Sequence, residues 1–177
     1  MCTVYNGRIV ADVRSYNVLF LCTGNSARSI LAEVILNTQS NGRYRAYSAG
    51  SHPAGKVNPW ALKLLEQKGL PTGGLRSKSW DEFVRPGAPS IDFVFTVCGN
   101  AAGEICPVWP GQPVTAHWGI EDPAAVTGDE MIIMGAFRTA FAQMERRIQL
   151  FLALTINSLQ GVALKRALDE IGHTPAG

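Results

Sequence analysis

The sequence predicts one α/β domain, in which a mostly parallel four-stranded sheet is flanked by helices. Short apolar runs of strand length alternate with longer segments whose apolar residues recur every three or four positions, as in other parallel sheets. A polar loop lies between the first apolar run and the first helical segment, where ligands bind in sheets of this kind. The 177 residues, 46% hydrophobic and 17% charged, have the composition of an ordinary globular chain.

Four segments are expected to be strands. The first is a short apolar run, NVLFL, of the kind that a buried parallel strand requires, and the second is closed by Gly50. In chain order they are residues 17–21, 44–49, 92–97 and 113–117. The first run ends directly before Cys22, so the polar loop is expected to start at a strand end.

Four further segments have helical spacing, and the first directly follows the polar loop. The second has Asn58 as its N-cap and Gly69 just past its end. A long helix is expected to start near Thr127 or Asp129, and a last amphipathic segment covers 159–171. The expected core stripe of the long helix comprises Met131, Met134, Phe137, Phe141, Met144, Ile148 and Phe151.

Charge and hydropathy argue against several classes of partner. A net charge of +2 is too small to favour nucleic acid or an acidic membrane surface. No stretch approaches the roughly 20 apolar residues that cross a bilayer, and no signal peptide is visible, so the cytoplasm is the expected location. The expected organisation is an N-terminal extension at 1–16, one domain at 17–172 and a tail at 173–177.

The polar loop has the residue types that bind a tetrahedral oxyanion. It comprises Cys22, Thr23, Gly24, Asn25, Ser26, Ala27 and Arg28. Gly24 and Asn25 readily adopt left-handed backbone angles, which let successive N–H groups point inward beside a helix N-terminus. Arg28 offers a planar fork for two oxygens of the anion. This positive surrounding, helped by Ser29, is expected to lower the pKa of Cys22 and make it a nucleophile.

A displacement at the oxyanion also needs a proton for the departing oxygen. Asp122 is the best candidate for the acid, since Pro123 restricts its loop. Glu121 is the competing acid and could equally be a surface charge. The neighbouring His117 and Trp118 are expected to pack the loop rather than to act in catalysis.

A second pair of cysteines, Cys98 and Cys106, follows the third expected strand. The residues between them are mostly small, and such a segment can rearrange cheaply when two thiols have to meet. Four cysteines in a reducing compartment are seldom structural disulfides. Redox chemistry is therefore favoured here, over a metal site with His117 or two unrelated buried thiols.

Three stretches resemble one known family. The loop CTGNSARS with Ala32 and Glu33 after it, the segment HWGIEDP ending at Pro123, and VCGNAAGEICPVWP at 97–110 resemble the low-molecular-weight tyrosine phosphatase superfamily. Within it they resemble the thioredoxin-linked arsenate reductases, which have a role in arsenic resistance. The resemblance implies a low-molecular-weight tyrosine phosphatase-like fold and the reduction of arsenate to arsenite.

The resemblance implies a thiol relay without a bound cofactor. Cys22 attacks arsenate held by Arg28 while Asp122 protonates the leaving oxygen. Cys98 then displaces arsenite and forms a disulfide with Cys22, which Cys106 resolves. An external reductant, thioredoxin or glutathione with glutaredoxin, reopens the last disulfide. The alternatives are a tyrosine phosphatase that uses the same loop and acid, and a non-catalytic oxyanion or redox sensor.

The resemblance also raises a potassium site near the loop. Some family members bind the ion with residues that correspond to Asn25, Glu33 and Ser48, and the fourth side-chain ligand would fall at Trp80. The alternative for Glu33 is a polar helix residue that is hydrogen-bonded to the loop. The sequence leaves both interpretations open.

Overall fold

The computed structural model describes residues 3–5, 8–10, 14–99, 108–159 and 161–175. It confirms the predicted parallel sheet, whose strands are β3 (Tyr16–Cys22), β4 (Tyr44–Gly50), β5 (Phe93–Thr96) and β6 (Val114–His117). Their spatial order is β4-β3-β5-β6, so the strand that is first along the chain lies inside the sheet. The chain crosses from one side of β3 to the other after β4. Ligands bind at such a switch point, outside the carboxyl ends of the strands.

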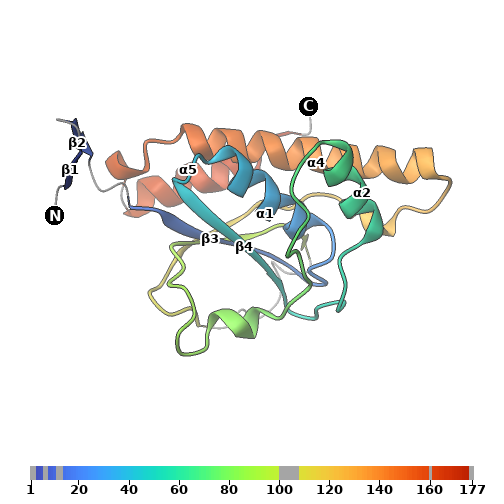
Figure 1. Ribbon diagram of the computed structural model, residues 1–177, viewed down its shortest axis with the longest axis horizontal. Coiled ribbons are helices and arrows are strands. Elements are labelled where there is room, and N and C mark those ends of the chain that lie inside the picture. Colours follow the sequence, from blue (N-terminus) through green and yellow to red (C-terminus); the bar gives the residue numbers. More distant parts are fainter. Residues whose placement is uncertain (1–2, 6–7, 11–13, 100–107, 160, 176–177) are drawn as a thin grey trace.

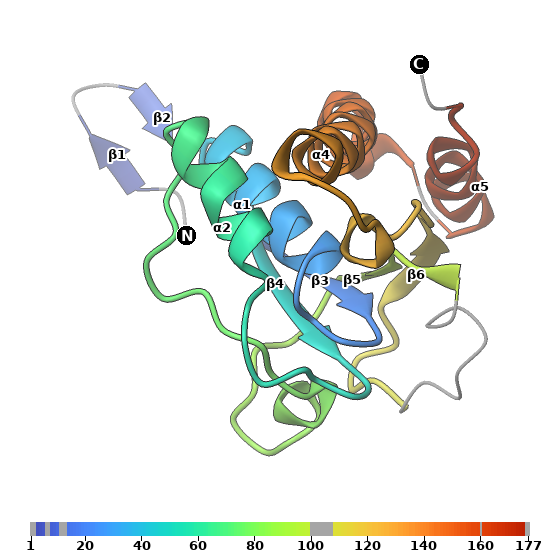
Figure 2. The ribbon, with the colours of Figure 1, turned by 90° about the vertical axis from the view of Figure 1, so that its right-hand side faces the viewer.

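The helices of the described residues are α1 (Arg28–Gln39), α2 (Pro59–Gln67), α4 (Glu130–Ala153) and α5 (Gly161–Gly172). Short 3₁₀ turns occur at η1 (Trp80–Phe83), η2 (Pro123–Ala125) and η3 (Ile156–Ser158). Figures 1 and 2 show the four helices on the same face of the sheet. The opposite face of the sheet is covered by η1 and its flanking segments, not by a long helix.

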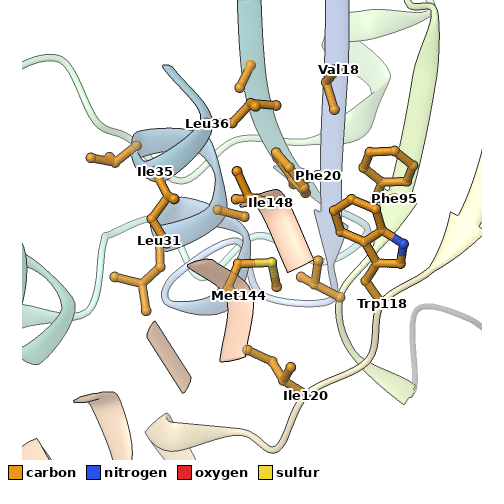
Figure 3. Packing of buried hydrophobic residues seen from close by; sticks show 14 of the residues in the cluster. Val18, Phe20, Leu31, Ile35, Leu36, Phe95, Trp118, Ile120, Met144 and Ile148 are labelled. Carbon is orange, nitrogen blue, oxygen red and sulfur yellow. The ribbon is translucent and has the colours of Figure 1, made fainter. Parts of the chain in front are cut away.

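The sheet separates two apolar clusters because neighbouring side chains of a strand point to opposite faces. Phe20 of β3 packs with α1 and α4 in the larger cluster, whereas Leu19 and Leu21 face the smaller one around Phe83. Figure 3 shows the larger cluster, where the rings of Phe95 and Trp118 stack with centroids 3.9 Å apart. These layers fix the ends of β3 and β5, from which the candidate site is built.

The predicted helix signals are confirmed in detail, with one exception. Asn58 caps α2 by accepting a hydrogen bond from Trp60 N, and Gly69 has a φ of +67° just past that helix. Asp129 caps α4. The exception is Met131, which was expected in the core stripe of α4 but is 74% exposed, since the first turn of this helix extends beyond the sheet.

The segment before the sheet contains a separate antiparallel pair, β1 (Thr3–Tyr5) and β2 (Arg8–Val10). Figure 1 shows this pair away from the four-stranded sheet. The first strand of the main sheet starts at Tyr16, one residue before the domain boundary expected from sequence. Among the described residues, no helix is long and apolar enough to cross a membrane.

Candidate active site

The oxyanion loop joins the end of β3 to the start of α1. Cys22 is the last residue of β3 and Arg28 the first of α1. Asn25 has a φ of +42°, as expected, whereas Gly24 does not adopt a positive φ. A Cβ added to Gly50 at the end of β4 would lie only 2.5 Å from Thr23 O, so a glycine there lets the loop approach the sheet.

Buried polar groups surround the Cys22 sulfur. Asn25 N donates a hydrogen bond to Cys22 Sγ over 3.2 Å, and Ser29 Oγ lies 3.0 Å from the same atom. Asn25 Nδ2 donates to Ser29 Oγ over 2.9 Å, which leaves the Ser29 hydrogen available to the sulfur. All three residues are at most 3% exposed. The loop thus presents two donors to the sulfur, as expected for a thiolate nucleophile.

The pKa of Cys22 differs from the sequence-based expectation. Burial raises the pKa of this thiol, because the charged thiolate is desolvated, and the hydrogen bonds from Ser29 and Asn25 lower it only in part. The nearby Cys98 raises the pKa further. Burial is therefore the largest effect on the pKa of this thiol, and the hydrogen bonds from Ser29 are the largest effect that opposes it.

Arg28 and Asp122 are brought together although they are far apart in sequence. Arg28 Nη2 donates to Asp122 Oδ2 over 2.7 Å, and Arg28 Nη1 donates to Ile120 O over 3.3 Å. Asp122 Oδ1 accepts from Ala124 N at the start of η2. Both residues line one cavity, in which the side chain of Arg28 is 14% exposed and that of Asp122 is 39% exposed. Asp122 is therefore the more accessible of the two to solvent. Glu121, the competing acid, is exposed and lines the same cavity.

The segment before Asp122 is anchored in the core. Trp118 is fully buried, and its Nε1 donates to Leu168 O over 2.9 Å, so it packs the loop as expected. Arg147 of α4 is 7% exposed, and its Nη1 donates to Trp118 O over 2.7 Å and to Gly119 O over 2.9 Å. A buried guanidinium thereby fixes the backbone that positions Asp122.

Cys98 lies close to the loop. It is 1% exposed, follows β5 by two residues, and its Sγ is 3.7 Å from Thr23 Oγ1. It lines a cavity of about 290 Å³ together with Arg28 and Asp122. Cys106, its expected relay partner, lies outside the described residues. Within the described part of the chain, no group of three His, Cys, Asp or Glu residues could hold a metal ion.

The residues expected at a potassium site do not fit that ion. Ser48 donates to Glu33 Oε2, and Lys78 Nζ lies 3.7 Å from the same carboxylate oxygen and 3.5 Å from Ser48 Oγ. Burial lowers the pKa of Lys78 and the Glu33 carboxylate opposes this change. An ammonium group thus already contacts the oxygens that a potassium ion would need. Asn25 Oδ1 is also engaged, since it accepts from Lys78 N over 2.8 Å.

Three residues of the site were missed from sequence: Gly50, Lys78 and Arg147. Each contributes through a contact with a residue far away along the chain. Of these three residues, only Gly50 had a signal in the sequence around it, because it directly follows an expected strand. That signal could not show which segment of the chain approaches the glycine. The lysine and the arginine looked like ordinary charged residues in a loop and a helix.

Comparisons with known proteins identify the family of the chain. Residues 17–163 match the family described as low molecular weight phosphotyrosine protein phosphatase. A protein named arsenate reductase from Halalkalibacterium halodurans is 35% identical over 134 residues, which are 76% of this chain and 93% of that protein.

Two solved structures show the same fold. The arsenate reductase from Archaeoglobus fulgidus is 30% identical with a TM-score of 0.61, over 77% of this chain and 99% of that one. A thioredoxin-dependent arsenate reductase from Corynebacterium glutamicum is 26% identical with a TM-score of 0.56, over 80% of this chain and 65% of that one. The chain therefore belongs to the low molecular weight phosphotyrosine protein phosphatase family.

Proposed function

We propose that this protein reduces arsenate to arsenite with thiols of its own chain. The observation that carries the proposal is the second buried thiol at the oxyanion loop. Cys98 Sγ lies 3.7 Å from the hydroxyl of Thr23, the residue next to Cys22, and lines the cavity of Arg28 and Asp122. Hydrolysis of a phosphate ester needs one thiol, whereas a two-electron reduction needs two. The similarity to proteins named arsenate reductase supports the choice of oxyanion.

The first step uses the loop and the acid. The bound arsenate takes over the Arg28 fork, which in this structure holds Asp122 and Ile120 O. Asp122, released from the ion pair, takes up a proton from solvent. The Cys22 thiolate then attacks arsenic, and Asp122 passes this proton to the departing oxygen, which leaves as water. The product is a Cys22–arsenate thioester in which arsenic is still As(V).

The second step transfers the electrons. The Cys98 thiolate attacks Cys22 Sγ, and the electron pair of the sulfur–arsenic bond moves to arsenic, so arsenite leaves as As(III). The two sulfurs are then joined in a Cys22–Cys98 disulfide. Cys106 attacks Cys98 Sγ, frees Cys22 and leaves a Cys98–Cys106 disulfide, which an external dithiol reduces.

Thioredoxin is the proposed electron donor, with glutathione and glutaredoxin as the alternative. The similarity to a thioredoxin-dependent arsenate reductase supports thioredoxin. Both reductants belong to the reducing compartment of the cell, so the reaction is assigned to the cytoplasm. The proposal uses no bound cofactor.

The test is arsenate-dependent NADPH oxidation, run in parallel with the thioredoxin and the glutaredoxin recycling systems. Steady turnover with either system, and faster turnover with thioredoxin, is the expected result. Cys22→Ser should lose all turnover, whereas Cys2→Ser, a control at a cysteine outside the proposed relay, should keep it. Absence of arsenate turnover with both systems would refute the proposal.

The second candidate is a phosphotyrosine phosphatase, which the family match favours and which would use the same Cys22, Arg28 and Asp122. Hydrolysis of an aryl phosphate separates the two functions. Cys98→Ser should leave this hydrolysis intact and stop multiple-turnover reduction of arsenate. Normal arsenate turnover in that variant would exclude the relay, and fast hydrolysis of phosphotyrosine without arsenate turnover would favour the phosphatase.

A further inference from the structure

Lys78 is a buried cation that the proposed reaction does not use. Its side chain is 9% exposed, and its Nζ lies 3.7 Å from Glu33 Oε2, 3.5 Å from Ser48 Oγ and 3.3 Å from Arg76 O. Glu33 is 17% exposed, and Ser48 is fully buried and donates its hydroxyl hydrogen to Glu33. The ammonium therefore sits among three oxygens in a region with little water, where a lone carboxylate would be unstable.

The same residue is connected to the nucleophile. Lys78 N donates to Asn25 Oδ1 over 2.8 Å, which fixes the side-chain amide of Asn25. The Nδ2 of that amide donates to Ser29 Oγ, and Ser29 lies 3.0 Å from Cys22 Sγ. The backbone of Lys78 thus orients the Asn25 amide, and this amide orients the Ser29 hydroxyl beside the sulfur. The ammonium of Lys78 connects the same segment to α1 and β4.

We propose that Lys78 is a positioning residue whose ammonium neutralises Glu33 in place of a monovalent metal ion and so holds the oxyanion loop in its binding shape. The enzyme then needs no potassium. The inference rests on the loop binding an oxyanion, as proposed above, but not on whether that anion is arsenate or an aryl phosphate. A potassium ion would meet a like charge at the oxygens that Lys78 Nζ contacts.

The experiment follows binding of inorganic phosphate, alkylation of Cys22 by iodoacetamide, and hydrolysis of an aryl phosphate, none of which involves the reductant. Each is measured at constant ionic strength in chloride salts of choline, sodium, potassium, ammonium or methylammonium. The wild-type protein should behave the same in all five salts. Lys78→Ala in choline should bind phosphate more weakly by roughly 10- to 100-fold, which is the usual loss when a residue that orients the ligands of a metal site is removed.

Chemical rescue separates a charge from a merely structural side chain. Potassium, ammonium or methylammonium should restore phosphate binding and the alkylation rate of Lys78→Ala in a saturable manner, because a small cation can enter the space beside Glu33. Choline, which is too large for that space, should not. Lys56→Ala, the control at an exposed lysine, should resemble the wild type in every salt.

The double variant Lys78→Met with Glu33→Gln covers the case in which Lys78→Ala does not fold. It removes both charges, so it should fold, and its phosphate binding should be weak and independent of the cation. The proposal would be overturned by potassium dependence of the wild type, by wild-type binding of phosphate by Lys78→Ala, or by rescue of the double variant by potassium. Failure of Lys78→Ala to respond to any cation would overturn it as well. Arsenate reduction enters none of these measurements, so their outcome is independent of the proposed reductase activity.

Discussion

Replacement of Ser29 by alanine tests the donors at the sulfur of Cys22. Ser29 Oγ lies 3.0 Å from Cys22 Sγ, is fully buried, and has its lone pair engaged by Asn25 Nδ2. A hydrogen bond to a charged group contributes about 1.5–3 kcal/mol. If the bond acts on the thiolate alone, the attack step should slow by roughly 10- to 150-fold at neutral pH, since 1.36 kcal/mol corresponds to a factor of ten.

The pH dependence distinguishes this explanation from simple misfolding. Burial raises the pKa of Cys22 and Ser29 lowers it, so the variant should have a still higher pKa. The rate of iodoacetamide alkylation, and that of single-turnover arsenate reduction, should then recover as the pH rises. Ser51→Ala, a control at a serine that contacts His52 instead, should keep the wild-type profile. A Ser29→Ala variant that is slow at every pH, or as fast as the wild type at pH 7, would refute the reasoning.

Three further replacements test the acid and the support of the two loops. Asp122→Asn should reduce turnover by about 10²–10⁴-fold. It should not weaken phosphate binding, because the ion pair with Asp122 no longer competes for Arg28. Near-normal turnover would assign the role of the acid to Glu121. Gly50→Ala should lower the free energy of unfolding in urea by about 1–3 kcal/mol. It should also weaken phosphate binding, because the added Cβ would lie 2.5 Å from a loop carbonyl oxygen. Unchanged phosphate binding would show that the loop adapts. Arg147→Met should lower the free energy of unfolding by about 2–4 kcal/mol, because two buried carbonyl groups lose their hydrogen-bond donor. Arg147→Lys should lower it less. Equal losses in the two variants would mean that only the packing of the side chain matters.

The first strand, the helix caps and the position of the first loop were predictable because their signals are local. A short apolar run of strand length, the residue types of 22–28 and the caps at Asn58 and Asp129 are all read from neighbours in the chain. Hydrogen bonds within a few residues fix the two caps, and both are present in the structure. The error at Met131 arose because helical spacing gives the face of a helix, but not where the sheet beneath it ends.

The oxyanion loop is the part that the sequence by itself determined, together with the family to which the chain belongs. Only the tertiary structure placed Asp122 on Arg28, showed that burial raises the pKa of Cys22, and put the Lys78 ammonium beside Glu33. The reason is physical. Burial and ion pairing depend on the distance between groups that the chain brings together from far apart, and a sequence pattern carries residue types but no such distances.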